Sequence, residues 1–456
     1  MVYSVQGVTD VNQKPLTLRD TLIFFIPLAL SGIMMSAGEP IVHSGLARLP
    51  TPELILAAYG VAFYAAVLIE APIIMLLPAS SALVRDESAY RLTRNAMLVI
   101  NAFLTVIMAL IIFSTPLYEF VFLRLLNYPE IVVERARGAL ALLLLWPATI
   151  GVRRFYQGIL IRLGHPRIVG LGTAARLLSM VLTVYIGVRY FPELGVLIGG
   201  GALIIGVIVD MIIAMVAARK YLLLGALPAH HPTTPKGARS VMGFVRFFLP
   251  LALTSTAWVL ARPLMLSGIA RAQEPTLSLA AFPVAMGTMM VLSGHLRMMQ
   301  QVVVALVEDP ETLRVVRRFA WLVGSVLTSV LGLLAFSYII YLYHGQVIGL
   351  KEPVLSMSNQ ALQMMVLMPF LTALQAYNQG ILIRAEDTIK VNVAALVNLI
   401  LLVGTLNILA VETDVPGYLI GGLVLPLALL GEVILLHRWS RPHVKTLLEP
   451  TGTFEP

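Results

Sequence analysis

The stretch "EPIVHSGLAR", residues 39–48, follows the first long apolar segment of the chain, and "RPLMLSGIAR", residues 262–271, is its near copy. Five of the ten positions are identical, but the leading glutamate, Glu39, is replaced by an arginine, Arg262, in the second copy. A segment that recurs within one chain indicates an internal repeat, and the reversed charge marks a position where the two copies differ in chemistry.

Further segment pairs keep the same spacing. The offset is 223 residues in the first part of each half and 222 after a one-residue slip. The matching pairs are "FFIPLAL" (24–30) with "FFLPLAL" (247–253), "LAAYGVA" (56–62) with "LAAFPVA" (279–285), "QGILIR" at 157–162 and 379–384, and "LIGG" at 197–200 and 419–422. The chain is therefore predicted to consist of two homologous halves.

The composition is typical of a membrane protein. Of the 456 residues, 58% are hydrophobic and 12% are charged, whereas a soluble protein carries about 25% charged residues. Apolar segments of roughly 20 residues are long enough to cross a hydrocarbon core of about 30 Å. We predict twelve spans, at 20–38, 54–79, 96–117, 138–160, 168–188, 195–217, 243–264, 277–302, 319–343, 357–381, 389–411 and 417–437.

The distribution of Lys and Arg predicts the topology. The terminal tails and the even-numbered loops carry 23 of them and the other loops carry 7. The positive-inside rule then predicts a multi-pass protein of the plasma (inner) membrane with both termini in the cytoplasm. The net charge of +8 is explained by this bias, so no nucleic-acid partner is predicted.

The two halves are predicted to form two lobes. Six spans per half is an even number, so the halves run in the same direction, as parallel repeats about an axis along the membrane normal. We predict an N-terminal lobe at 1–220, a cytoplasmic linker at 221–242 and a C-terminal lobe at 243–456. The fold class is therefore an all-α polytopic membrane protein in which two six-helix lobes enclose a central cleft.

Glu39 and Arg262 are expected near the outer ends of spans 1 and 7. If these spans face each other across the cleft, the two side chains form an ion pair that closes it from outside. Substrate or protons would open such a gate by competing for one partner. The alternative is that each charge lies unpaired at the water interface.

Other ionisable residues lie at membrane depth, where each costs several kcal/mol unless it is paired or hydrated. Glu70 lies in span 2, Arg176 in span 5 and Asp210 in span 6, and the last two match Asn398 and Glu432 of the second half. We expect Arg176 and Asp210 to pair with each other and hold one bundle together. Glu70 remains a candidate substrate or coupling residue.

Four basic residues are expected near the inner ends of spans 4 and 8: Arg153, Arg154, His295 and Arg297. If they face the cleft, they form a cationic surface that attracts anions from the cytoplasm. The alternative is ordinary anchoring, with the arginine side chains reaching to the membrane interface.

Pro147 and Pro369 interrupt spans 4 and 10, and prolines in such positions allow kinks or hinges. The sequence has no cysteine, no G-x-x-x-x-G-K-[ST] loop and no H-E-x-x-H motif. No Ser/His or paired-carboxylate arrangement occurs at helical spacing. We therefore predict neither a catalytic site nor a metal or cofactor site, and expect the protein not to be an enzyme.

Several of these stretches resemble the progressive ankylosis (ANK) family, within the multidrug, oligosaccharidyl-lipid and polysaccharide exporter superfamily. The resemblance lies in "FFIPLALSG", "GEPIVHSGLAR", "LAAYGVAFY", "FFLPLALTSTAWVLARPLMLSGIAR", "WPATIGVRRFYQGILIR" and "PLALLGEVILLHR". Glu39 matches the family's Gly-Glu step, and Arg262 with Pro263 matches its Arg-Pro step. The resemblance implies a MATE-like exporter fold of twelve helices with a central cleft.

The resemblance also implies a secondary transporter that exports pyrophosphate, ATP or a citrate-like anion by alternating access. The alternative is a MATE-like multidrug or lipid-linked saccharide exporter or flippase coupled to H+ or Na+, with Glu70 or Asp210 binding the cation. The Met-rich stretch "PVAMGTMMVLSGHLRMMQQ" (283–301) departs from the family and suits apolar ligands. The predicted partners are a small anionic substrate, a possible coupling ion and the lipid bilayer.

Overall fold

A computed structural model describes residues 16–225, 227–228, 240–385 and 387–448. Helices make up almost all of these ranges; the single β-bridge joins Gln273 to Pro416. The helices of the first half are α1 (Leu18–Ser36), α2 (Gly38–Leu46), α3 (Pro52–Ile74), α4 (Leu76–Leu83), α5 (Glu87–Phe113), α6 (Thr115–Glu119), the π-helix η1 (Phe120–Leu125), α7 (Glu130–Leu142), the 3-10 helix η2 (Leu143–Leu145), α8 (Trp146–Arg162), α9 (Pro166–Tyr190), η3 (Pro192–Leu194) and α10 (Val196–Leu223).

The second half repeats this order. Its helices are α11 (Val241–Arg271), α12 (Pro275–Ser293), the 3-10 helix η5 (Gly294–Met298), α13 (Met299–Leu306), α14 (Pro310–Ala335), α15 (Tyr338–Leu342), the π-helix η6 (Tyr343–Ile348), α16 (Val354–Met364), α17 (Met368–Arg384), α18 (Thr388–Glu412) and α19 (Gly417–Leu448). Much of the predicted linker, residues 226 and 229–239, lies outside the described residues. The division at 1–220, 221–242 and 243–456 stays a prediction.

The helix inventory confirms the predicted all-α polytopic fold. In the described ranges, nine helices are long and apolar enough to cross a membrane, and the bent pair α16 and α17 is a tenth. The predicted span at 243–264 corresponds to the first part of α11, where Val241–Leu253 is apolar but shorter. The span at 138–160 is broken into α7, η2 and α8.

Local backbone features recur at equivalent positions of the two halves. Thr51 and Glu274, which precede α3 and α12, both adopt left-handed backbone angles, with φ of 52° and 53°. Asp86 and Asp309 both cap a helix with their side chains, α5 and α14 respectively. Left-handed angles are uncommon for non-glycine residues, so their recurrence shows that both halves follow the same local folding pattern.

The two predicted hinge prolines lie where a helix begins anew. Pro147 is in the first turn of α8 and Pro369 in the first turn of α17. A proline is tolerated there because its missing N–H would have no intrahelical partner. The axes of α16 and α17 differ by 43°. The break is therefore present in both halves, and hinge motion at these sites stays a prediction.

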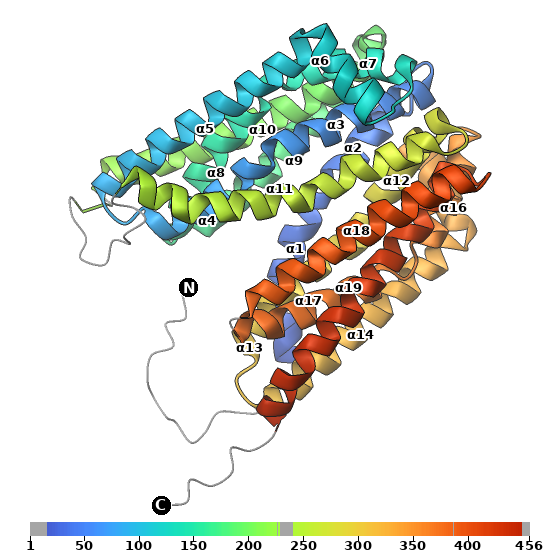
Figure 1. Ribbon diagram of the computed structural model, residues 1–456. Helices are drawn as coiled ribbons and strands as arrows, with labels where there is room; N and C mark the ends of the chain where they lie inside the picture. The colour runs from blue at the N-terminus through green and yellow to red at the C-terminus, as the bar shows by residue number, and fades with distance from the viewer. Residues whose placement is uncertain (1–15, 226, 229–239, 386, 449–456) are drawn as a thin grey trace, which may run out of the picture.

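The first helix of each half packs against the other half, α1 along most of its length and α11 while it also contacts α18 of its own half (Figure 1). In this view α1, in blue, lies among the helices of the second half, and α11, in yellow-green, runs along the first half. The ring of Phe25 in α1 packs edge-on against Phe319 of α14, with ring centroids 5.6 Å apart. Ser255 of α11 donates a hydrogen bond of 2.8 Å to the carbonyl of Ala71 in α3. We call the two resulting helix groups the first and second bundles.

The bundles meet at one end of the molecule. In Figure 1 they converge where α2, α12 and α16 lie, and their opposite ends, where α5 begins and α19 ends, point apart. The predicted topology assigns the converging end to the outside and the diverging ends to the cytoplasm. The arrangement therefore brings residues of the two halves together at the converging end.

Close helix packing inside each bundle depends on glycine. A Cβ atom on Gly158 of α8 would lie 2.5 Å from the carbonyl oxygen of Leu77 in α4, whereas one on Gly201 of α10 would meet no atom within 4 Å. We expect Gly158→Ala to destabilise the protein by about 1–3 kcal/mol through overpacking. Gly201→Ala is the control. The melting temperature of the purified protein should fall only in Gly158→Ala; equal values for both variants would contradict this packing.

Candidate functional site

The pair singled out by the reversed charge lies at the converging end of the bundles. Arg262 Nη1 of α11 is 3.6 Å from Glu39 Oε1 of α2. Their side chains are 24% and 17% exposed, so the pair is partly screened from solvent. The Arg262 guanidinium also lies 5.6 Å from the ring centroid of Tyr64, within the range of a cation–π contact. The structure thus joins two residues 223 positions apart in the sequence.

Arg48, the last residue of the first repeated stretch, connects the halves at the same end. Its guanidinium donates hydrogen bonds of 2.8–3.0 Å to three carbonyls at the C-terminal end of η6, those of Gln346, Val347 and Ile348. The last carbonyls of a helix lack intrahelical donors and carry partial negative charge. The Arg48 guanidinium supplies them with hydrogen bonds and with a positive charge. Sequence reasoning missed Arg48, although the repeat retains an arginine at this position, Arg271.

Arg271 also joins the two halves. It donates to Asn407 Oδ1 over 2.6 Å and to the carbonyl of Leu125, at the end of η1, over 3.3 Å. The hydroxyl of Tyr128 donates a 3.0 Å hydrogen bond to the carbonyl of Pro263. Together with Arg48 and the Glu39–Arg262 pair, these contacts hold the converging ends of the two halves against each other.

The interior of the first bundle contains a buried ion pair. Arg153 Nη1 of α8 is 2.9 Å from Asp210 Oδ2 of α10, and the Asp210 residue is 1% exposed. Gln157 Nε2 donates to the same carboxylate over 3.2 Å. Residues four apart lie on one face of a helix, so Arg153 and Gln157 both point toward α10. The ion-pair partner of Asp210 is therefore Arg153, not Arg176 as the sequence suggested.

Arg154 and Arg176 complete a charged cluster around this pair. Both interact electrostatically with Glu70 and Asp210, and neither forms an ion pair with a carboxylate in the described ranges. Glu70 instead accepts a hydrogen bond from the indole N–H of Trp146. We call these residues the arginine cluster: Glu70, Arg153, Arg154, Arg176 and Asp210.

The arginine cluster carries more positive than negative charge, with three arginines and two carboxylates. The Nε–H groups of Arg153, Arg154 and Arg176 are buried and find no hydrogen-bond acceptor among the described residues. A buried donor without an acceptor costs about 1–3 kcal/mol. The cluster therefore has both the charge and the free donors to hold an anion.

The corresponding position of the second bundle is different. Glu432, the counterpart of Asp210, accepts hydrogen bonds from the amides of Asn398 over 2.5 Å and Gln379 over 3.2 Å. The counterpart of Arg153 is Gln375, so the second bundle has no arginine at this repeated position. Arg297 interacts electrostatically with both Glu432 and Arg262. Both bundles thus have a carboxylate at this position, but only the first bundle surrounds it with the arginine cluster.

The four basic residues proposed as one cationic surface occupy different environments. Arg153 and Arg154 belong to the arginine cluster. His295 lies in η5, where its backbone faces Gly32 of α1 and its ring centroid is 6.2 Å from that of Phe25. The structure therefore places the two arginines of α8 in one cluster, whereas His295 lies apart from them at the contact between η5 and α1.

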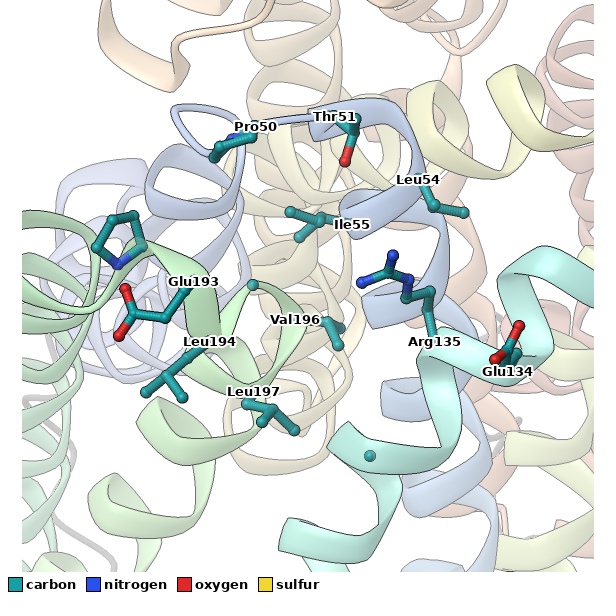
Figure 2. A pocket seen from close by; sticks show the side chains of 13 residues that line it. Pro50, Thr51, Leu54, Ile55, Glu134, Arg135, Glu193, Leu194, Val196 and Leu197 are labelled. Carbon is teal, nitrogen blue, oxygen red and sulfur yellow. The ribbon is translucent and has the colours of Figure 1, made fainter.

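A surface cavity of about 390 Å³ lies elsewhere, between the start of α3, α7 and the start of α10 (Figure 2). Thr51, Ile55 and Leu54 line it from the start of α3, and Arg135 and Glu193 stand on opposite sides of it. The cavity shares no residue with the arginine cluster or the Glu39–Arg262 pair, and its lining mixes both signs of charge. It does not add to the candidate site.

Comparison with known proteins identifies the fold. Residues 233–430 match the family described as progressive ankylosis protein (ANKH), and no curated protein matches the sequence. An inward-facing multidrug resistance MATE family transporter of the MOP superfamily has a TM-score of 0.71 and 16% identity, over 93% of this chain and 99% of the other.

Two further solved structures share the fold. The lipid II flippase MurJ in an inward closed conformation has a TM-score of 0.61 and 11% identity, over 93% of this chain and 90% of the other. A MOP superfamily transporter from Pyrococcus furiosus, described as having a binding pocket of reverse polarity, has a TM-score of 0.57 and 15% identity, over 96% of this chain and 98% of the other. The protein is therefore an integral multi-pass membrane protein with the fold of the MATE and MOP superfamily transporters, and the predicted resemblance to the progressive ankylosis family is confirmed over residues 233–430.

Proposed function

We propose that the protein is a secondary transporter that exports an anionic metabolite of the pyrophosphate, ATP or citrate class by alternating access. The observation that carries the proposal is the excess of buried arginine in the first bundle. Arginine binds phosphates and carboxylates with strong, charge-assisted and often bidentate hydrogen bonds. The unsatisfied Nε–H groups of Arg153, Arg154 and Arg176 supply donors for such an anion.

The mechanism follows from the contacts between the halves. The outer ends are joined by the Glu39–Arg262 pair and by Arg48 on η6, while the inner ends of the bundles point apart. An anion enters from the cytoplasm and is held by the arginine cluster. The anion then moves from the cluster to Arg262 and displaces Glu39 from it, so that the pair separates and the bundles rock to open the outer end.

Ligand binding tests the substrate class directly. A ligand that binds only the folded protein raises its melting temperature, by an amount equivalent to about 2.7 kcal/mol at 100 times its Kd. Pyrophosphate, ATP or citrate should therefore raise the melting temperature of the purified protein more than chloride at equal ionic strength. A shift with a lipophilic cation, and none with any polyanion, would refute the proposal.

The Glu39–Arg262 gate predicts that fixing the outer ends together stops transport. The chain has no native cysteine, so Glu39→Cys with Arg262→Cys provides the only two thiols. A short bis-methanethiosulfonate cross-linker should reduce substrate flux to the level of empty liposomes, and reduction should restore it. The untreated double variant, which lacks the ion pair but can still open, sets the reference flux, and each single cysteine variant treated in the same way is the control for the reagent. Full flux in the cross-linked double variant would show that this end does not open.

The second candidate is a multidrug or lipid-linked saccharide exporter coupled to H+ or Na+. Two observations favour it: the fold is shared with the lipid II flippase MurJ, and α12 contains the buried methionines Met286 and Met289, whose flexible side chains suit apolar ligands. In that case Glu70 or Asp210 would bind the coupling cation. Transport of a lipophilic cation that depends on these carboxylates would favour this candidate.

A further inference from the structure

We propose that the second bundle binds the headgroup of an anionic phospholipid in a cavity between α14, α17 and α19. The cavity has a volume of about 590 Å³. It lies near the beginning of α14 and the end of α19, at the end of the bundle that the predicted topology assigns to the cytoplasmic leaflet. None of the residues that line it belongs to the arginine cluster or to the Glu39–Arg262 pair.

Three arginines supply the charge for this site. Arg317 comes from α14, and Arg438 and Arg441 come from α19. Arg441 donates a 3.2 Å hydrogen bond to His437, but none of the three arginines forms an ion pair with a carboxylate in the part of the chain that the structure describes. Basic pockets between membrane helices bind phosphate-bearing lipid headgroups, with about 1 kcal/mol for each basic residue near the surface.

The internal repeat explains why the cavity exists. The 222-residue offset pairs Asn378 with Tyr156 and Arg441 with Arg219. In the first bundle, Arg219 Nε donates to the Tyr156 hydroxyl over 3.4 Å, and the ring occupies the space beside the guanidinium. In the second bundle, the shorter Asn378 folds back onto the carbonyl of Leu374 over 2.7 Å. Because Asn378 has no ring, the space beside Arg441 stays open and its guanidinium has no tyrosine hydroxyl as a partner there.

The lining also contains a polar group without a partner. Tyr377 is 4% exposed, and its hydroxyl finds no hydrogen-bond partner among the described residues. A buried hydroxyl without a partner is costly. A phosphate oxygen that enters between the arginines would accept a hydrogen bond from it, so the site combines charge with a directed donor.

The surroundings favour a lipid over a soluble anion. Trp321 and Ile434 line the cavity and are 52% and 57% exposed, on the outer surface of the bundle. Tryptophan is enriched at the membrane interface, and an exposed isoleucine beside it offers a surface for an acyl chain. A cavity that opens next to apolar side chains thus presents its arginines to the bilayer.

Quenching of tryptophan fluorescence tests the site, because Trp321 lines it. Purified protein in mixed micelles is titrated with phosphatidylglycerol or phosphatidylcholine that carries bromine on its acyl chain, and the Trp321→Phe variant gives the background. The Trp321 signal should be half-quenched at a mole fraction of phosphatidylglycerol that is lower by on the order of 100-fold, as expected for about 1 kcal/mol from each of the three arginines.

Three variants distinguish a specific site from general attraction. Arg438→Gln combined with Arg317→Gln should remove the preference for phosphatidylglycerol, and Asn378→Tyr should do so by filling the cavity. Arg318→Gln, an exposed arginine on the same helix that does not line the cavity, should leave it intact. The double arginine variant decides the question even if Asn378→Tyr does not fold.

Two results would overturn the proposal. Equal quenching by the two lipids would show that the arginines do not select an anionic headgroup. Displacement of phosphatidylglycerol by millimolar inorganic phosphate or pyrophosphate, at constant ionic strength, would show that the cavity is a site for a soluble anion.

Discussion

Replacing Arg154 with glutamine is expected to lower the initial rate of polyanion transport by about 10- to 100-fold. Arg154 lies in the arginine cluster without an ion-pair partner among the described residues, and its Nε–H lacks an acceptor. Its loss leaves two arginines against two carboxylates, so the cluster no longer carries a net positive charge. A hydrogen bond to a charged group contributes about 1.5–3 kcal/mol, which corresponds to the expected loss.

The measurement is uptake of labelled substrate into proteoliposomes with matched amounts of inserted protein. Arg318→Gln removes an equal charge from an exposed position and serves as the control. Because the substitution keeps a hydrogen-bonding side chain, Arg154→Gln should retain the melting temperature of the parent within a few degrees. A parent-like rate in Arg154→Gln would show that the arginine cluster does not bind the transported anion.

Replacing Asp210 with asparagine is expected to be the most destabilising single change in the cluster. It leaves the guanidinium of Arg153, which is 5% exposed, without its partner at 2.9 Å. Removal of one member of a buried ion pair costs about 3–5 kcal/mol, because the remaining charge is uncompensated. The melting temperature of the purified protein should fall by several degrees or more.

The internal repeat provides the matched control. Glu432→Gln makes the same chemical change at the equivalent position, where the carboxylate is bonded to the amides of Asn398 and Gln379. Among the described residues Glu432 has no ion-pair partner as close as that of Asp210, although Arg297 interacts with it electrostatically. A smaller loss is therefore expected, of about 1–3 kcal/mol for hydrogen bonds at a buried polar group. If Glu432→Gln lowered the melting temperature as much as Asp210→Asn, the Arg153–Asp210 pair would not be the main support of the first bundle.

The repeat made much of the fold predictable. Matching segments fixed the equivalence of the two halves, and the structure extends it to paired left-handed residues and paired helix breaks, at Thr51 and Glu274 and at Pro147 and Pro369. The reversed charge at one repeated position singled out Glu39 and Arg262 as a candidate pair, with unpaired charges at the water interface as the alternative; which of the two holds depends on whether the helices face each other, and in the structure the two side chains meet. The identical arginine at the end of each copy also carried a signal, since Arg48 and Arg271 both join the halves.

Other features depend on three-dimensional packing that the sequence does not encode locally. The sequence of α1 and α11 does not reveal that α1 packs against the second half and that α11 lies between α3 and α18, because both helices are largely apolar. The partner of Asp210 was mispredicted because Arg153 and Arg176 lie on different helices that both pack against α10, and only the rotation of each helix decides which guanidinium reaches the carboxylate. The lipid cavity arises from one missing ring, at Asn378, which spacing alone does not reveal.

The central claim, that the protein moves a polyanion across the membrane, is tested most directly by flux through the parent protein. Proteoliposomes would be loaded and assayed with labelled pyrophosphate, ATP and citrate, and in parallel with a lipophilic cation. We predict saturable uptake of at least one polyanion, absent from liposomes without protein and abolished by cross-linking Cys variants of Glu39 and Arg262. Uptake of the cation with no uptake of any polyanion would contradict the claim.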